Sequence, residues 1–363
     1  MKAVLYVAVV FSFLNVAHAA DVKVPSREPP PNPTFTATPD PLLAAYYIDP
    51  QGSDANPGTR EQPFATPGKA QAAVRSFLAA LKPAAKGGIA VFVSPGTYFL
   101  PETLTFTAED SGPETVTVVW KSPGEERPVF SGGLPVGAGG WKRDKGDVWV
   151  TEVEQAKNGK WVFRDLYADG NRLPRARHPN SASPYAHKLS HWRAAKDNRV
   201  KASYMYPLNK DDFFEVVDFR DEARKHLVLD RQIPGGDIGK GAEMVLLNIW
   251  SITRAAVMSS DKNELVSRDT LGNEKSYFSA AHIGHYLYLE NARAFVDSPG
   301  EWFLDGKTGL LYYHAAPGTD PGRMRFIAPR LAHILKIAGE SGRPVRNLHF
   351  EKIAFSHADW TLP

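Results

Sequence analysis

The stretch YIDPQGSDANPGTREQPFATPGKAQAAVR, residues 47–75, joins a short β-type run to a helical pattern through a loop rich in Gly, Pro, Asp and Asn. Residues 66–82 place alanine and larger apolar side chains on one side at helical spacing, which predicts an amphipathic helix. Thr66 stands at the expected N-cap position and Pro67 at the first helical position. We expect the loop and the helix to form a cap over the strands that follow.

The rest of the chain is typical of β-structure. Short runs of apolar and β-branched residues are separated by Pro and Gly turns, among them IAVFVSPGTYFL (89–100), TLTFTA (103–108) and TVTVVWKSP (115–123). Such continuous runs are typical of parallel strands stacked in the coils of a solenoid, whose first coil needs a cover. Longer alternating strands from residue 213 onward indicate a second β-region. The predicted fold is an all-β solenoid with an N-terminal capping helix and an inserted antiparallel β-domain.

The same patterns predict how the chain is divided. Pro-rich and polar residues precede the first strand and indicate a linker. The expected segments are a signal peptide (1–20), a Pro-rich linker (21–45), the cap and first coils (46–184), the inserted β-domain (185–335) and a return to the solenoid (336–363).

The first twenty residues have the layout of a secretory signal peptide. Lys2 precedes an apolar run that is too short to span a bilayer, and Ala17-His18-Ala19 is a small-x-small cleavage site. The alternative is a membrane anchor. With no cysteine for disulfides or for a lipid anchor, the chain fits a secreted or periplasmic bacterial protein. We expect the mature chain to begin at Ala20 or Asp21.

Charge and composition exclude several classes of function. The 363 residues carry a formal net charge of +3, with basic and acidic residues interspersed, so nothing indicates binding to nucleic acid or to a membrane. P-loop, GxGxxG and GxSxG patterns are absent. We expect a monomer without a cofactor or a metal. Two alternatives are a zinc site in HKLSHW (187–192) and a calcium site in the loop at Asp49, Asp54 and Asn56.

Three later stretches complete a resemblance that begins with residues 47–75. They are DLYADGNRLPRARHPN (165–180), SPGEWFLDGKTGLLYYHAAPG (298–318) and RPVRNLHFEKIAFSHADW (343–360). In this order they resemble the group of carbohydrate-active proteins around glycoside hydrolase family 141. The resemblance implies a right-handed parallel β-helix, a pectate-lyase-like solenoid. It also implies hydrolysis of plant or pectic glycans, with α-L-fucosidase and xylanase activities in the family, and a polysaccharide or oligosaccharide substrate.

The chain departs from that group at its C-terminal end. In such proteins the main β-helix continues well past the segment resembling 343–360, and the reactive carboxylates are expected on those later coils. This sequence ends at Pro363. We therefore expect either a fragment of a longer protein, which we favour, or a short relative with an incomplete cleft.

Glycoside hydrolysis needs two carboxyl groups beside the scissile bond, and Asp359 is the acidic residue with the most suggestive setting. Asp359 follows a strand and lies near His357 and beside Trp360 in the sequence. Side chains alternate along a strand, so we expect His357 and Asp359 on one face if the strand continues. We predict Asp359 as a catalytic carboxylate, His357 as a hydrogen-bonding partner of the sugar and Trp360 as a stacking surface. The alternative is a solvated strand end with a packed tryptophan.

The segment PRARHPN (174–180) supplies further predicted substrate contacts at Arg175, Arg177 and His178. By strand parity the two arginines point the same way and can bind a carboxylate with two hydrogen bonds each. A uronate carboxylate would suit a polysaccharide lyase, whereas a protein carboxylate would make the arginines a structural link. On strand NIWSITR (248–254), Trp250 and Arg254 share a face, and core packing with a surface salt bridge is the simpler interpretation.

The sequence is compatible with three functions. A secreted glycoside hydrolase is the leading hypothesis, a polysaccharide (uronate) lyase is the second, and a non-catalytic glycan-binding or adhesion module is the third. Solenoid folds carry all three, so the fold alone does not choose between them.

Overall fold

The computed structural model describes residues 40–180, 210–239, 241–248, 252–272 and 281–360. In this part of the chain 24 strands accompany a single α-helix, α1 (Pro67–Ala80). Short 3₁₀ turns lie at Ala108–Asp110, Glu154–Gly159, Lys210–Asp212, Arg293–Phe295 and Pro321–Arg323. The strands form six sheets, three parallel and three antiparallel.

Helix α1 forms where the sequence predicts it. The hydroxyl of Thr66 caps the helix by accepting a hydrogen bond from the Lys69 N–H, and Pro67 opens the first turn. Ala70, Val74 and Leu78 are buried on one side at helical spacing and join the core of the parallel sheets. The prediction of a capped amphipathic helix is confirmed, with the helix ending at Ala80.

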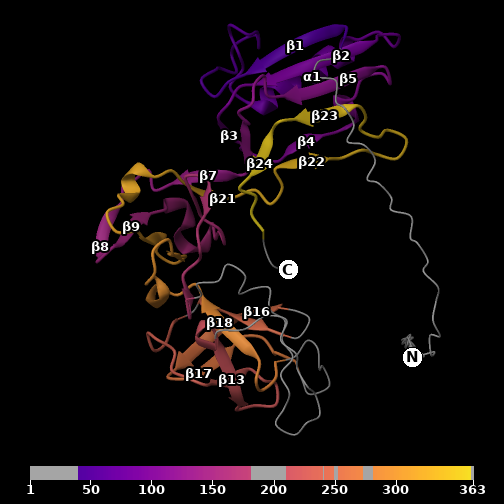
Figure 1. The fold of residues 1–363 in the computed structure, drawn as a ribbon. Coiled ribbons are helices and arrows are strands. Elements are labelled where there is room, and N and C mark those ends of the chain that lie inside the picture. Colours follow the sequence, from indigo (N-terminus) through magenta and orange to yellow (C-terminus); the bar gives the residue numbers. More distant parts are fainter. Residues whose placement is uncertain (1–39, 181–209, 240, 249–251, 273–280, 361–363) are drawn as a thin grey trace, which may run out of the picture. The chain divides into compact units, whose positions relative to one another are not determined.

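Parallel strands are confined to the beginning and the end of the chain (Figure 1). They form one sheet of four strands, one of three and one of two. The four-stranded sheet has β1 (Leu42–Ile48), β2 (Gly87–Val93), β5 (Val116–Lys121) and β23 (Leu348–Glu351). The smaller sheets have β3 (Thr97–Phe99), β6 (Val129–Ser131) and β24 (Ala354–Ser356), and β4 (Leu104–Phe106) and β22 (Leu335–Ile337). Strands β23 and β24 thus pair with β5 and β6, far from them in sequence.

Two four-stranded antiparallel sheets follow. The first contains β7 (Gly133–Val136), β10 (Tyr167–Ala168), β11 (Asn171–Arg172) and β21 (Phe326–Pro329). The second contains β8 (Lys142–Lys145), β9 (Val148–Glu152), β19 (Trp302–Asp305) and β20 (Leu310–His314). Strands from the range 302–329 therefore pair with strands from the range 133–172. A common core of aromatic and aliphatic side chains, including Phe163 and Trp302, lies between these elements.

The remaining seven strands form an antiparallel sheet in which six strands close into a barrel. Strand β18 pairs with both β13 and β15, which completes the circle through β14, β17 and β16. Closure leaves few open edges for pairing with other chains. The strands are β12 (Arg177–His178), β13 (Phe214–Phe219), β14 (His226–Leu229), β15 (Glu243–Leu247), β16 (Ile252–Asp261), β17 (Glu264–Ser267) and β18 (Tyr286–Glu290).

The predicted fold class, a right-handed parallel β-helix, is wrong. The described residues are all-β, but most of their strands lie in antiparallel sheets, which have seven, four and four strands, whereas the parallel sheets have four, three and two. The buried side chains form separate clusters instead of one continuous stack. The physical reason is that a short apolar run indicates a strand with both faces covered and says nothing about the direction of its neighbour. Strand β18, buried at every position, lies in the barrel wall and pairs antiparallel on both sides.

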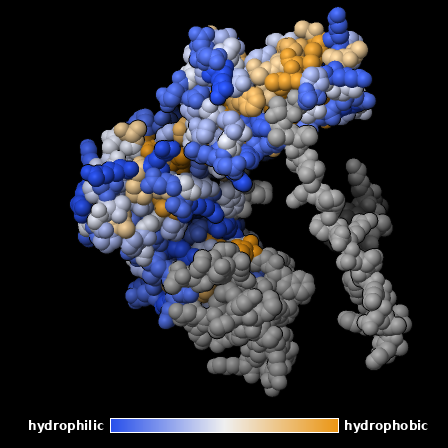
Figure 2. All heavy atoms as spheres, turned by 45° about the horizontal axis from the view of Figure 1, so that its top comes forward, coloured by the Kyte–Doolittle hydropathy of each residue, from blue (hydrophilic) through white to orange (hydrophobic). Residues whose placement is uncertain are grey.

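The described residues on the face drawn in Figure 2 are mainly polar. Hydrophilic side chains cover most of the face in Figure 2, and hydrophobic ones gather in a few separate patches. No helix among the described residues is long and apolar enough to cross a membrane. Strand β1 begins at Leu42, earlier than the predicted start of the folded part at Tyr46.

Candidate functional site

A pocket of about 600 Å³ brings together two of the sequence segments predicted to bind substrate. Its walls come from the segment before and along β12, from strands β16 and β18 of the barrel, and from the end of the described chain. It is lined by Arg164, Asp165, Arg172, Leu173, Pro174, Arg175, Arg177, Arg254, Tyr288, Glu290 and Trp360. We call it the arginine pocket.

Strand geometry explains why Arg175 and Arg177 face the pocket together. Ala176 lies between them, is fully buried and packs into the barrel core. Its neighbours on either side must therefore point to the opposite face. Pairing of β12 with β18 sets Arg177 beside Glu290. The predicted common direction of the two arginines is consistent with their shared position in the pocket lining.

Two glutamates hold three of the arginines. Arg164 binds Glu243 through both of its terminal nitrogens, and Arg175 Nη2 donates to Glu243 Oε1 at 3.0 Å. On the other side, Arg254 Nη1 donates to Glu290 Oε2 at 2.6 Å. Removing one partner of such a buried pair leaves the other charge uncompensated, which strongly destabilises the fold. Arg175 therefore has the protein carboxylate partner that the structural alternative required.

The charges of this network are mutually stabilised. Burial alone would raise the pKa of Glu243, but the hydrogen bonds and charges of Arg164 and Arg175 outweigh it and lower this pKa to about 2. Burial by itself would lower the pKa of Arg254, and the charge and hydrogen bond of Glu290 reverse that effect and raise it. Glu243 and Arg254 are therefore both ionised at neutral pH.

Arg177 is placed differently from its neighbours. Its guanidinium lies over the ring of Tyr288, with the guanidinium carbon 4.1 Å from the ring centroid. Its backbone N–H donates to the buried carboxyl of Glu301 at 3.2 Å. Nε lies 3.4 Å from the Pro179 carbonyl oxygen, and the buried Nη2 has no hydrogen-bond partner among the described residues. Arg177 is thus held in position without a carboxylate partner in the part of the chain that the structure describes.

Trp360 and Asp165 form the other side of the pocket. The indole Nε1 of Trp360 donates to Asp165 Oδ2 at 2.8 Å, and Arg172 donates to Asp165 Oδ1, with its Nε at 2.8 Å. The guanidinium of Arg164 lies 5.2 Å from the Trp360 ring centroid. Trp360 remains 38% exposed, so part of its ring is open to a ligand. An exposed aromatic face with fixed polar groups beside it is suited to a sugar ring.

Asp359 is partly buried and adjoins this group without lining the pocket. Its backbone N–H donates to the Leu331 carbonyl oxygen at 2.8 Å. Burial raises the pKa of the Asp359 carboxyl, and the charge of Asp165 raises it further against the opposing effects of the Trp360 N–H and Arg164. Two carboxyl groups with different surroundings, Asp359 and Asp165, therefore interact next to Trp360.

The structure places the two predicted histidines outside the pocket lining. His357 is buried, with Nδ1 2.9 Å from Ser131 Oγ and its ring centroid 4.7 Å from that of Tyr167. His178 stacks on Phe295 at 5.7 Å between ring centroids. Burial lowers the pKa of both imidazoles, so both are neutral at pH 7. In this arrangement they support the surrounding strands.

Sequence reasoning missed several residues of the site. Asp165 and Arg172 lie in the quoted stretch 165–180 but were not singled out, although an acidic residue near clustered arginines is a usable signal. Arg254 was interpreted as part of a surface salt bridge, and it does pair with Glu290. Glu243 and Glu290 had no local signal, because their partners are distant in the sequence.

The residues of the calcium alternative, Asp49, Asp54 and Asn56, belong to no metal-binding cluster among the described residues. Asp54 holds the N-cap residue of α1 by accepting hydrogen bonds from the backbone N–H and hydroxyl of Thr66, and Asn56 donates to the Pro63 carbonyl oxygen. Among the described residues, no group of three or more His, Asp or Glu side chains is arranged to hold a metal ion. The predicted HKLSHW segment (187–192) and Trp250 lie outside the described residues.

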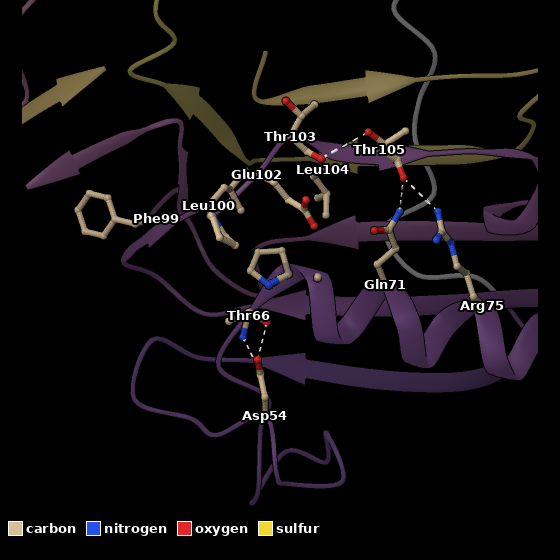
Figure 3. Close-up of a pocket in the computed structure, with 13 residues that line it drawn as sticks. Asp54, Thr66, Gln71, Arg75, Phe99, Leu100, Glu102, Thr103, Leu104 and Thr105 are labelled. Carbon is tan, nitrogen blue, oxygen red and sulfur yellow. Dashed lines mark hydrogen bonds between the residues drawn. The ribbon is translucent and has the colours of Figure 1, made fainter. Parts of the chain in front are cut away.

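A second pocket of about 600 Å³ lies between α1 and strand β4 (Figure 3). We call it the cap pocket. Gln71 and Arg75 point from the helix toward Thr105, whose carbonyl oxygen accepts hydrogen bonds from both. Arg75 and Gln71 also donate to the buried carboxylate of Asp110.

Comparisons with known proteins identify one informative relative. No family model matches this chain, and no curated protein matches it. A solved structure described as a glycoside hydrolase matches 87% of this chain and 51% of its own, with 27% identity and a TM-score of 0.68. The chain spans about half the length of that hydrolase.

Two further solved structures show weaker similarity. "The complex structure of XylC with xylose" matches 88% of this chain and 36% of its own, with 14% identity and a TM-score of 0.35. A rhamnogalacturonan lyase matches 24% of this chain and 21% of its own, with 30% identity and a TM-score of 0.18.

Proposed function

We propose that this chain belongs to a secreted glycoside hydrolase, of the group around family 141, that acts on plant or pectic glycans. The observation that carries the proposal is the similarity to a glycoside hydrolase over 87% of the chain with a TM-score of 0.68. Export rests on the signal-peptide pattern of residues 1–20. The family rests on the four quoted motifs, and the plant or pectic substrate on that resemblance.

For the chemistry we propose the carboxyl groups of Asp359 and Asp165. Asp359 has a raised pKa, which suits a general acid that protonates the leaving oxygen. Asp165 accepts hydrogen bonds from Arg172 and Trp360 as a carboxylate, which suits the second role, a base or a nucleophile. Trp360 provides the stacking surface for the sugar ring.

The test is Asp359→Asn in the complete protein. The amide keeps the shape of the side chain but cannot donate the proton, so the rate of reducing-end release from plant polysaccharides should fall at least ~10²-fold. Asp261→Asn, at the exposed end of strand β16, is the matched control and should keep full activity. Melting temperatures of both variants should stay close to that of the parent. Retained activity in Asp359→Asn would contradict the assignment of this residue.

The same assay separates the competing functions. A uronate lyase leaves an unsaturated sugar that absorbs in the near ultraviolet, whereas a hydrolase releases reducing ends without that absorbance. A binding module shows affinity without either product. Product absorbance or the lack of any turnover would therefore overturn the proposed hydrolysis.

A further inference from the structure

The arginine pocket has more positive than negative charge. Five arginines line it, whereas its lining carboxylates are Asp165 and Glu290, with Glu243 behind them. A cleft with an excess of one sign focuses the electrostatic potential and attracts ligands of the opposite sign. The near-neutral charge of the whole chain does not predict this local excess.

Four of these arginines already bind carboxylates of the protein. Arg164 and Arg175 bind Glu243, Arg254 binds Glu290, and Arg172 binds Asp165. Arg177 is the exception, because no carboxylate of the described residues lies within ion-pair distance of it. Because Arg164 and Arg175 share Glu243, five arginines face three carboxylates, and Arg177 is the one of the five without a carboxylate partner among the described residues.

A second set of unused donors lies beside Arg177. Arg175 has only 8% of its side chain exposed, yet Nε and Nη1 have no hydrogen-bond partner among the described residues. Its Nη1 is 3.8 Å from the nearest oxygen of Glu290, which is beyond hydrogen-bond distance. Buried polar groups are normally satisfied, so unused donors of two adjacent arginines indicate a missing acceptor.

Arg177 is also preorganised for a ligand. Stacking on Tyr288 fixes the plane of its guanidinium, and the bond from its backbone N–H to Glu301 fixes the chain. A rigid guanidinium binds a planar anion such as a carboxylate with two parallel hydrogen bonds and little loss of entropy. A neutral hydroxyl group would leave the charge uncompensated.

The neighbouring surface adds the second half of the recognition. Trp360 lines the same pocket with part of its ring exposed, so a sugar ring can stack there while its charged group reaches the arginines. Building on the proposed function, we propose that the arginine pocket binds a sugar unit carrying an anionic group. Arg177 is its primary ligand, and Arg175 supports it. A carboxylate of a uronate and a sulfate ester share this chemistry.

Binding of monosaccharides tests the proposal without any turnover. Isothermal titration of the complete chain would compare D-galacturonate with its methyl ester, which has the same ring without the charge. Galactose 6-sulfate would serve as the second anion. We expect at least one of the two anionic sugars to bind ~10-fold or more tighter than the ester, because charge-assisted hydrogen bonds are lost in the ester. The tighter anion identifies the source of the charge.

Arg177→Gln should weaken binding of that anionic sugar ~10- to 100-fold and leave binding of the ester unchanged. Arg323→Gln is the matched control, because this arginine is exposed on a 3₁₀ turn outside the pocket, and it should bind as the parent does. Equal affinity for charged and uncharged sugars, no binding of any of them, or unchanged binding in Arg177→Gln would each overturn the proposal.

The outcome is separable from that of the proposed function. If Asp359→Asn keeps full activity but Arg177 still discriminates charged sugars, the anion site stands and the catalytic assignment is wrong. If hydrolysis depends on Asp359 but the pocket ignores charge, the hydrolase stands and the anion site is wrong.

Discussion

The arginine pocket and the cap pocket have the same volume of about 600 Å³, yet their polar groups are satisfied to different degrees. In the cap pocket Arg75 donates to both oxygens of Asp110 at 2.9 and 2.8 Å, and Gln71 completes the same carboxylate at 3.0 Å. Asp110 in turn accepts a hydrogen bond from the Thr107 N–H and closes a capping box. These contacts tie α1 to strand β4 and to the 3₁₀ turn Ala108–Asp110.

In the arginine pocket, some buried nitrogen donors have no hydrogen-bond acceptor among the described residues. Arg175 and Arg177 both have nitrogens without a hydrogen-bond partner among the described residues. Volume alone does not distinguish a structural cavity from a binding site, whereas the balance of donors and acceptors does. The protein itself satisfies the arginine of the cap pocket, whereas two arginines of the arginine pocket keep donors without a partner among the described residues.

The largest expected effect comes from removing the charge that holds the arginine pocket together. Glu243→Gln would leave Arg164 and Arg175 buried beside an uncharged amide, so we expect the free energy of unfolding to fall by about 3–5 kcal/mol. Denaturation in urea at pH 7 would measure it. Glu264→Gln, which removes a solvent-screened partner of Arg220 and His226, is the control and should leave the free energy of unfolding nearly unchanged. Equal losses in the two variants would show that the buried network adds no stability.

The next largest effect is a pH dependence of the free energy of unfolding. It comes from Glu301, whose carboxyl accepts a hydrogen bond from the Arg177 N–H. Burial raises the pKa of Glu301 to about 7, against the hydrogen bonds it accepts from the Ser298, Asp297 and Arg177 N–H groups. A carboxyl whose pKa is higher in the folded state stabilises the fold below its unfolded pKa near 4.5, and this stabilisation is lost as pH rises through 7. Its size is at most about 3 kcal/mol, at 1.36 kcal/mol per pKa unit.

We therefore expect Glu301→Gln to flatten the decline of stability between pH 5 and pH 8. Thermal unfolding across this range would measure it. Glu102→Gln, an exposed residue of the cap pocket, should leave the decline unchanged. Glu243 contributes in the opposite sense, because its lowered pKa makes its stabilisation disappear as pH falls from about 4.5 toward 2. An unchanged slope between pH 5 and pH 8 in Glu301→Gln would contradict the raised pKa.

Local signals in the sequence predicted the local features well. The N-cap at Thr66, the proline at the first turn and the apolar spacing of α1 all lie within one short segment, and the helix forms as predicted. The common direction of Arg175 and Arg177 follows from the alternation of side chains along an extended segment. Strand direction has no such local signature, which is why short apolar runs were misinterpreted as a solenoid throughout.

Features that depend on distant residues were not predictable from one sequence. Arg164 and Glu243 are 79 residues apart, and Trp360 and Asp165 are 195 residues apart. Trp360 and the two arginines were predicted as substrate contacts and line one pocket, whereas His357 and His178 have buried or stacked positions elsewhere. A histidine beside a carboxylate in sequence is compatible with both a site and a packed strand end, and only the tertiary contacts distinguish them.

The smallest effect separates the two pockets through one arginine in each. Arg75→Gln breaks two hydrogen bonds to Asp110, which is 1% exposed, so it should cost about 1–3 kcal/mol of unfolding free energy. Arg177→Gln breaks no ion pair with a described residue and loses mainly the stacking on Tyr288, so we expect a change of about 0.5–1 kcal/mol at most. Urea midpoints at constant m-value would measure both.

Adding a ligand sharpens this last comparison. An anionic sugar that binds through Arg177 should raise the melting temperature of the parent and of Arg75→Gln, but much less that of Arg177→Gln, because only ligand bound to the folded state adds stability. If Arg177→Gln instead loses as much stability as Arg75→Gln and the sugar raises all three melting temperatures equally, Arg177 is a structural residue. The two pockets would then differ only in the pairing of their charges.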